Sequence, residues 1–135
     1  AALPLLEQGL EPAIVFIASK NVLAPGPGAG AYSAAKAGLT QMARVAALEL
    51  GSAGIRVNVL HPNAVFDTGV WDEETLEKRA QHYGLSVEEY KQNNVLKKTV
   101  TSHDVAVLAR IFAGNETAST TGAQVPVDGG NDRVI

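Results

Sequence analysis

The feature that most constrains the fold is an alternation of short apolar runs with helical segments. Residues 13–18 (AIVFIA) are continuously apolar and rich in β-branched side chains, which is typical of a parallel strand covered on both faces. Residues 55–60 (IRVNVL) and 123–127 (AQVPV) are predicted as two further strands. An alanine-rich segment over residues 31–50, ended by Gly51, predicts a long helix between the first two strands. This order predicts an α/β layer architecture with right-handed parallel crossovers.

Three shorter helices are expected between the second and third strands, at about residues 72–82 and 86–93 and from near Ser102. The second begins with Ser86 and Glu89 at the spacing of a capping box. With about three strands, the predicted sheet is the carboxy-terminal half of a Rossmann-like, doubly wound parallel sheet. Its inner edge would be left unpaired.

Composition excludes several classes of protein and site. The chain has 135 residues, a net charge of −3 and no Cys. The length allows one domain but not a complete two-halved dinucleotide-binding domain. A mildly acidic balance argues against nucleic acid or an anionic membrane as partner, and the longest apolar run is far short of the roughly 20 residues of a spanning helix. No metal site is expected, because the three His are scattered and thiolates are absent.

The sharpest candidate chemistry lies in Ser19, Tyr32 and Lys36. Ser19 follows the first strand at its carboxyl end, where open α/β sheets place their ligands. Tyr32 and Lys36 lie four residues apart at the start of a helix and share a face. An ammonium beside a phenol favours the phenolate, so such a Tyr can exchange a proton with an alcohol or carbonyl oxygen. The alternative is a chance pair, with a solvated Lys and a half-buried Tyr.

The stretch IVFIASKNVLAPGPGAGAYSAAKAGL resembles the active-site segment of the short-chain dehydrogenase/reductase family. IRVNVLHPNAVFDTG is similar to the family's next strand and nicotinamide-contacting turn, and TTGAQVPVDGG to its last strand and carboxy-terminal motif. The resemblance implies an NAD(P)-dependent oxidoreductase, with Tyr32 as acid/base, Lys36 on the nicotinamide ribose and Ser19 on the substrate oxygen. It also implies cofactor contacts from Tyr32, Pro62, Asn63 and Val65, beside that of Lys36. Asn63 stands where the family has a Gly, and the Thr that normally follows is displaced to Thr68.

The resemblance also implies what the chain does not contain. The family's glycine-rich pyrophosphate loop and its catalytic Asn have no counterpart, so residues 1–135 are expected to be a single partial domain without the amino-terminal nucleotide-binding half. The opening residues accordingly read as the last turns of a helix, with Gly9 at its end. Gly26–Ala31 matches a G-x-G-x-x-A pattern, but it does not leave a strand directly and is interpreted as a rim of the cleft.

A narrower resemblance concerns the substrate. FIASKNVLAPGPGAGAYSAAKAG, HPNAVFDTG and DGGNDRVI are similar to the carboxy-terminal part of bifunctional rhamnulose-1-phosphate aldolase/lactaldehyde (alcohol) dehydrogenases. This implies NAD in preference to NADP, a small alcohol or aldehyde such as lactaldehyde as substrate, a role in rhamnose metabolism and a cytoplasmic location. Residues 69–98, with Trp71 and Tyr83, take the place of the family's variable substrate lid.

Two questions stay open at this stage. The helix over residues 31–50 is apolar almost all round, which favours a homo-oligomer formed through it. The alternative function is a non-catalytic α/β dimerisation or interaction module that retains the dehydrogenase fold.

Overall fold

The computed structural model describes residues 2–131 and contains one three-stranded parallel sheet. The strands lie in the order β1 (Ala13–Ile17), β2 (Arg56–Pro62) and β3 (Gln124–Val127). β1 and β2 pair in register from Ala13 opposite Arg56, and β2 and β3 from Val59 opposite Gln124. The predicted fold class, a half-size parallel α/β sheet, is confirmed.

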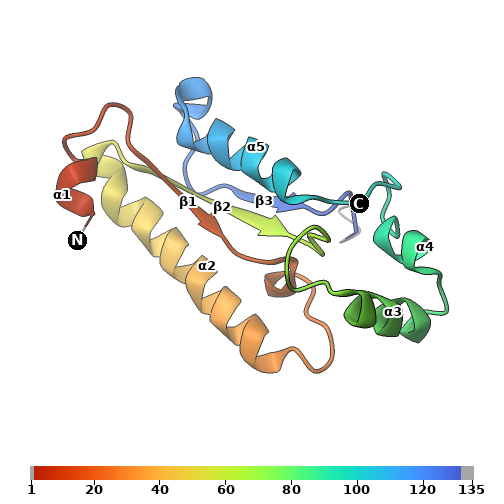
Figure 1. The fold of residues 1–135 in the computed structure, drawn as a ribbon. Coiled ribbons are helices and arrows are strands. Elements are labelled where there is room, and N and C mark those ends of the chain that lie inside the picture. The colour runs from red at the N-terminus through yellow and green to blue at the C-terminus, as the bar shows by residue number, and fades with distance from the viewer. Residues whose placement is uncertain (1, 132–135) are drawn as a thin grey trace.

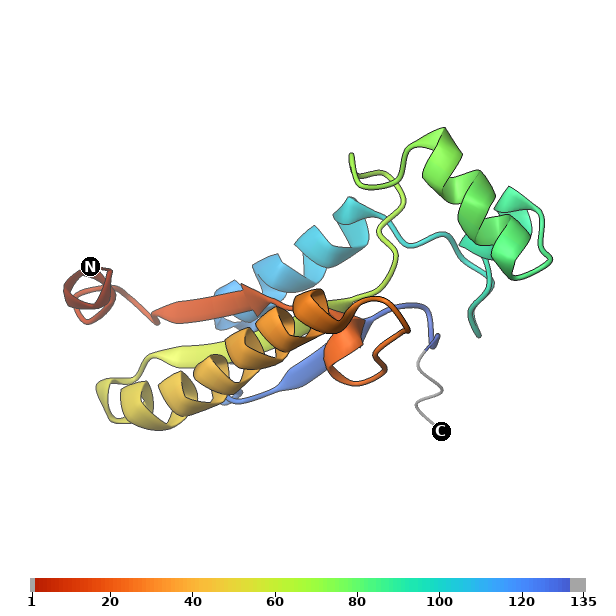
Figure 2. The same ribbon diagram turned by 90° about the horizontal axis from the view of Figure 1, so that it is seen from below.

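Helices cover both faces of this sheet. The helices are α1 (Leu3–Leu6), α2 (Gly30–Leu50), α3 (Glu73–His82), α4 (Val87–Lys91) and α5 (Ser102–Ala113), with 3₁₀ turns η1 (Lys20–Val22), η2 (Gly51–Ala53) and η3 (Asn115–Thr117). α2 lies along one face and α5 along the other, while α3 and α4 lie beyond the carboxyl ends of the strands (Figure 1). Seen from below, the two long helices sandwich the strands (Figure 2). Within residues 2–131, no helix is long and apolar enough to cross a bilayer.

Each face of the sheet has its own apolar core. On the α2 face, Ala43 and Ala47 pack against Val57 and Val59 of the central strand. These small alanine side chains allow the helix to lie close to the sheet. On the α5 face, the buried residues come from β2, β3, α5 and the segment before α5: Leu60, Val127, Phe112 and Val100. The central strand is therefore buried on both sides, as the apolar run over residues 55–60 predicts.

The element boundaries differ slightly from those expected. β2 continues two residues beyond Leu60, because β3 pairs with it there and Asn63 donates its backbone N–H to the Val127 carbonyl at 3.1 Å. Pro62 is tolerated because it is the last residue of the strand. α4 is shorter than the predicted 86–93, although its Ser86–Glu89 capping box is present.

Candidate active site

Ser19 lies two residues beyond the end of β1 and is buried. Its extended backbone, at φ −164° and ψ 151°, caps η1. Its Oγ accepts a hydrogen bond from the backbone N–H of Asn21 at 3.2 Å, and its carbonyl oxygen accepts one from the N–H of Val22 at 3.1 Å. The hydroxyl proton and a second lone pair on Oγ are left for another ligand, because a hydroxyl has one donor and two acceptor positions.

Tyr32 and Lys36 lie on the first turns of α2. The Lys36 ammonium donates a hydrogen bond to the Ile17 carbonyl at 3.0 Å and lies 5.9 Å from the centroid of the Tyr32 ring. Tyr32 itself is half exposed. Lys36 therefore connects the start of the helix to the last residue of β1, two residues before Ser19.

All three predicted site residues thus lie at the carboxyl end of β1. Among the hydrogen bonds of residues 2–131, none joins Ser19 to Tyr32 directly; Lys36 is the side chain that contacts both segments. The arrangement leaves a phenol, an ammonium and a hydroxyl at one edge of the sheet. Such a set can hold an alcohol or carbonyl oxygen and exchange a proton with it.

The turn after β2 carries the other predicted cofactor contacts, Pro62, Asn63 and Val65. Ala64 has a positive φ of 38°, in the left-handed region that residues with a Cβ rarely adopt. The Thr68 hydroxyl closes the turn by donating to the Val65 carbonyl at 2.8 Å. The displaced Thr is therefore used inside the turn, and its oxygen keeps a free acceptor position.

The donor set fits one end of a dinucleotide. Lys36 has three N–H donors and uses one on Ile17, which leaves two for the hydroxyl oxygens of a ribose. The segment 26–30 follows η1 and not a strand, so it does not form the pyrophosphate cradle that opens a dinucleotide-binding helix. Residues 2–131 therefore suit the nicotinamide ribose and provide no strand-to-helix glycine loop for the pyrophosphate.

Two residues near Ser19 were underestimated or missed in the sequence. His61 is fully buried, with Nδ1 2.9 Å from the Ser19 carbonyl oxygen and Nε2 2.7 Å from Oε1 of Gln124. His61 directly precedes Pro62 of the nicotinamide-like turn, which indicates a place near the site, but nothing in the sequence indicates Gln124. The alternation of side chains in β2 could have indicated that His61 is buried, because it places His61 on the same face as Val57 and Val59. A buried imidazole on such a face requires polar partners.

The expected lid region is held together by aromatic rings. Phe66 lies 5.0 Å from Trp71 and 5.8 Å from Tyr90, measured between ring centroids, and Tyr83 stacks on Tyr90 at 5.7 Å. Burial raises the pKa of the Tyr90 hydroxyl. Trp71 is packed in the cluster by its contacts with Phe66 and Tyr90, while Tyr83 remains half exposed. The cluster joins α3 and α4 to the loop that leaves β2.

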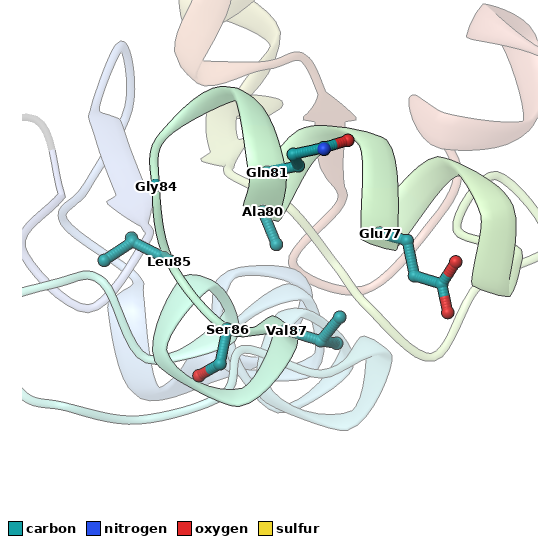
Figure 3. A pocket seen from close by; sticks show the side chains of 7 residues that line it. All are labelled: Glu77, Ala80, Gln81, Gly84, Leu85, Ser86 and Val87. Carbon is teal, nitrogen blue, oxygen red and sulfur yellow. The ribbon is translucent and has the colours of Figure 1, made fainter.

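Two open hollows lie in the same region. One, of about 530 Å³, lies between α3 and α4 and is lined by Glu77, Ala80, Gln81, Gly84, Leu85, Ser86 and Val87. Figure 3 shows Ala80 and Val87 on opposite sides of it, with the Gly84–Ser86 loop between the helices. The other, of about 440 Å³, lies between residues 96–100 and the turn after β3. Ser19, Tyr32 and Lys36 line neither hollow.

The turn after β3 ties residues 93–96 to the segment that follows Ser19. The Leu96 N–H donates to the Gly129 carbonyl at 3.0 Å. The Asn131 side chain donates to the Asn93 carbonyl at 2.6 Å and accepts a hydrogen bond from the Lys20 ammonium, next to Ser19. The last described residues therefore connect segments that lie far apart in the sequence.

Residues 1–132 match the family model described as enoyl-(acyl carrier protein) reductase. The chain is 38% identical over 122 residues to YuxG, an uncharacterised oxidoreductase of Bacillus subtilis, covering 87% of this chain and 18% of that protein. It is 34% identical over 122 residues to a D-beta-hydroxybutyrate dehydrogenase of Rhizobium meliloti, covering 87% and 46%. The chain thus spans about half or less of the length of these curated relatives.

Solved structures agree on the fold. An NADPH-bound short-chain oxidoreductase of Pseudomonas aeruginosa, described as having an atypical catalytic centre, superposes with a TM-score of 0.80 at 31% identity, covering 95% of this chain and 49% of that one. Sorbitol-6-phosphate 2-dehydrogenase of Erwinia amylovora gives 0.80 at 26% identity, covering 94% and 51%. In both cases the chain corresponds to about half of the solved protein.

Proposed function

The chain belongs to the short-chain dehydrogenase/reductase family, and we propose that it forms the carboxy-terminal part of a dehydrogenase domain acting on a small alcohol or aldehyde. The observation that supports this best is the position of Lys36, which contacts the Tyr32 ring and the end of the strand that leads to Ser19. Its curated relatives include oxidoreductases and hydroxybutyrate dehydrogenases by name.

The proposed roles follow from the donors and acceptors available. NAD(P), when bound, accepts or supplies the hydride at its nicotinamide ring. In the reducing direction, the Tyr32 hydroxyl gives its proton to the substrate oxygen as the carbonyl carbon gains the hydride. The Ser19 hydroxyl donates a hydrogen bond to the same oxygen and holds it for the transfer. Lys36 binds ribose hydroxyls with its two remaining donors.

We assign the pyrophosphate loop to a part of the domain that the relatives have and this chain does not span. NAD is the proposed cofactor. A relative from Mycobacterium tuberculosis that is named as NAD-dependent favours NAD, whereas the NADPH-bound oxidoreductase of Pseudomonas aeruginosa favours NADP. Pro62, Asn63 and Val65 are proposed to line the nicotinamide.

Lactaldehyde is the proposed substrate. YuxG is matched over 18% of its length, whereas the hydroxybutyrate dehydrogenase is matched over 46% by an equally long segment. YuxG is therefore more than twice as long, which leaves room for a further domain beside the part that this chain matches. A chain of that size is compatible with the bifunctional aldolase/dehydrogenase arrangement and hence with rhamnose metabolism.

We also propose that α2 mediates homo-oligomerisation. Met42, Val45 and Leu48 leave 56%, 42% and 84% of their surfaces exposed on the helix that covers the sheet. Apolar side chains of this size on one exposed face favour burial against a second copy.

The experiment that tests the function uses the full-length protein that contains this chain. Lactaldehyde is supplied with NADH or NADPH, and both nicotinamide absorbance and formation of the diol are followed. We expect turnover, faster with NADH. If the folded protein turns over with neither cofactor and still self-associates, the non-catalytic interaction module becomes the better reading.

A further inference from the structure

We propose that His61 and Gln124 form a positioning pair that fixes the carbonyl group of Ser19 and thereby aims its hydroxyl. The inference rests on the proposed function of Ser19 and adds two residues to the machinery around it. Both lie on the α2 face of the sheet, His61 near the end of β2 and Gln124 at the start of β3.

The pair reaches Ser19 at a point where sheet pairing has stopped. The ladder between β1 and β2 ends at Ile17 opposite Leu60, with one further bond from the Ala18 N–H to the Leu60 carbonyl at 2.8 Å. Beyond that bond, the contact between His61 Nδ1 and the Ser19 oxygen, at 2.9 Å, provides the link back to β2. The His61 imidazole thus links Ser19 to β2 beyond the last backbone hydrogen bond between β1 and β2.

The hydrogen-bond inventory determines which protons the pair carries. Each ring nitrogen of His61 faces an oxygen atom, Nδ1 the Ser19 carbonyl and Nε2 the Oε1 of Gln124. A neutral imidazole has only one N–H and cannot donate to both. A buried imidazolium would satisfy both but would bury a charge, and no ion pair of His61 occurs among the described residues. Meanwhile Nε2 of Gln124 is buried and has no hydrogen-bond partner within residues 2–131.

Exchanging the oxygen and nitrogen of the Gln124 amide resolves the conflict at His61, because each of its two contacts then joins one donor to one acceptor. Gln124 then donates from its nitrogen to His61 Nε2, and His61 donates from Nδ1 to the Ser19 carbonyl. The Gln124 nitrogen is then bonded to His61, and its oxygen takes the buried position that the nitrogen held. His61 is a neutral imidazole protonated at Nδ1.

This arrangement saturates the Ser19 carbonyl. The oxygen accepts one hydrogen bond from the Val22 N–H at 3.1 Å and one from His61, which uses both of its lone pairs. Two donors from different directions fix the peptide plane after Ser19. Since Oγ is in turn held by the Asn21 N–H, the direction of the hydroxyl is determined from both ends of the residue.

The first test reads the tautomer and does not depend on activity. Full-length protein labelled with ¹⁵N-histidine is studied by NMR, and the His61 signal is assigned by its loss in His61→Asn. We expect a proton on Nδ1 and none on Nε2. A proton on Nε2, or on both nitrogens at neutral pH, would overturn the proposal even if the enzyme is active.

The second test compares two substitutions that each keep one half of the pair. The Asn amide nitrogen occupies the place of His Nδ1 and preserves the bond to Ser19, whereas the Gln amide oxygen occupies that of Nε2 and preserves only the bond accepted from Gln124. With lactaldehyde and NADH, we expect kcat to fall about tenfold in His61→Gln and clearly less in His61→Asn. Equal losses in both variants that follow their thermal stability would reduce His61 to a structural role and overturn the proposal.

A double-mutant cycle separates positioning of Ser19 from general damage. In a Ser19→Ala background, His61→Gln is expected to cause no further loss of kcat, because the hydroxyl that it positions is gone. Losses that multiply would overturn the proposal. Failure of the wild-type protein to turn over would instead count against the proposed function, and the tautomer measurement would still decide the pair.

Discussion

The ammonium of Lys36 lies 5.9 Å from the ring centroid of Tyr32 and simultaneously donates to the Ile17 carbonyl at 3.0 Å. One side chain therefore relates the start of α2 to the end of β1. Because that hydrogen bond anchors the ammonium, its distance from the Tyr32 ring depends on the packing of the helix against the sheet and not on a flexible surface side chain.

Replacing Tyr32 by Phe tests the acid/base role. The substitution removes the hydroxyl and keeps the ring over which Lys36 lies. In the full-length enzyme we expect kcat with lactaldehyde and NADH to fall by about 10² to 10⁴, the range that general acid–base catalysis contributes. Steady-state kinetics provides the measurement.

Tyr83→Phe is the matched control, because Tyr83 is also half exposed but lies after α3 in the aromatic cluster. It loses the same hydroxyl and is expected to keep kcat within about twofold. An unchanged kcat in Tyr32→Phe would refute the mechanism.

Local patterns were sufficient to predict the elements around the site. The apolar run before Ser19, the alanine-rich segment with Tyr32 and Lys36 four residues apart, and the capping box at Ser86 are each encoded in a few neighbouring residues. Periodicity and capping chemistry act at that range, so the sheet, its helices and their order follow from the sequence.

Contacts between distant segments could not be predicted in the same way. Gln124 meets His61 across 63 positions, and Arg56 meets Thr117 across 61. A polar residue in a strand shows only that it needs a partner, and the identity of that partner depends on strand order and register. The interactions that position Ser19 were therefore visible only once β3 was placed beside β2.

Arg56 is expected to be a major determinant of stability. Its buried guanidinium donates to the carbonyls of Phe112 at 3.0 Å and Gly114 at 2.8 Å, and to Thr117 Oγ1 at 3.0 Å. It thereby satisfies carbonyls at the carboxyl end of α5 and complements the helix dipole. Arg56→Leu should lower the free energy of unfolding by about 3 kcal/mol, since several buried acceptors lose their donor.

Urea denaturation of the full-length protein measures this effect. Arg44→Leu is the control, because Arg44 is exposed on α2 and contacts only Gln41 at 3.4 Å among the described hydrogen bonds. That change should stay within about 0.5 kcal/mol of wild type. Equal losses in the two variants would show that the network of Arg56 contributes nothing.

The link between Asp67 and Ser102 predicts a pH dependence. The Ser102 hydroxyl and backbone N–H each donate to the Asp67 carboxylate at 2.7 Å, and these two bonds lower the pKa of that carboxyl. A pKa that is lower in the folded state contributes stability that is present above the unfolded value of about 4 and disappears as the pH falls through the folded value. Asp67→Asn should therefore lower Tm at pH 7, and the difference should vanish in acid.

Thermal unfolding of wild type and Asp67→Asn, measured from pH 7 down to a pH below the pKa of Asp67 in the folded protein, tests this prediction. As a second check, Ser102→Ala removes the hydroxyl donor and should move the pKa of Asp67 back towards its ordinary value, as followed by NMR of the carboxyl carbon. A difference in Tm that persists unchanged at low pH would contradict the expectation.

Gly129 is expected to hold the base of the lid. Its φ is +66°, and a Cβ added there would lie 2.6 Å from Cγ of Asn94. Asn94 cannot swing away freely, since its side chain binds both the carbonyl and the N–H of Lys98, at 2.6 and 3.2 Å. Gly129→Ala should therefore separate the turn from residues 93–98 and break the bond from Leu96 to Gly129.

Hydrogen exchange at the Leu96 amide reports this event directly, because that N–H donates to the Gly129 carbonyl at 3.0 Å. In Gly129→Ala we expect its protection to fall by about tenfold or more, which corresponds to about 1.4 kcal/mol of local opening. Gly26→Ala is the control, since no atom lies within 4 Å of a Cβ built there and its φ lies outside the left-handed region. Unchanged protection at Leu96 in Gly129→Ala would mean that the lid is held elsewhere, with the aromatic cluster around Tyr90 as the next element to test.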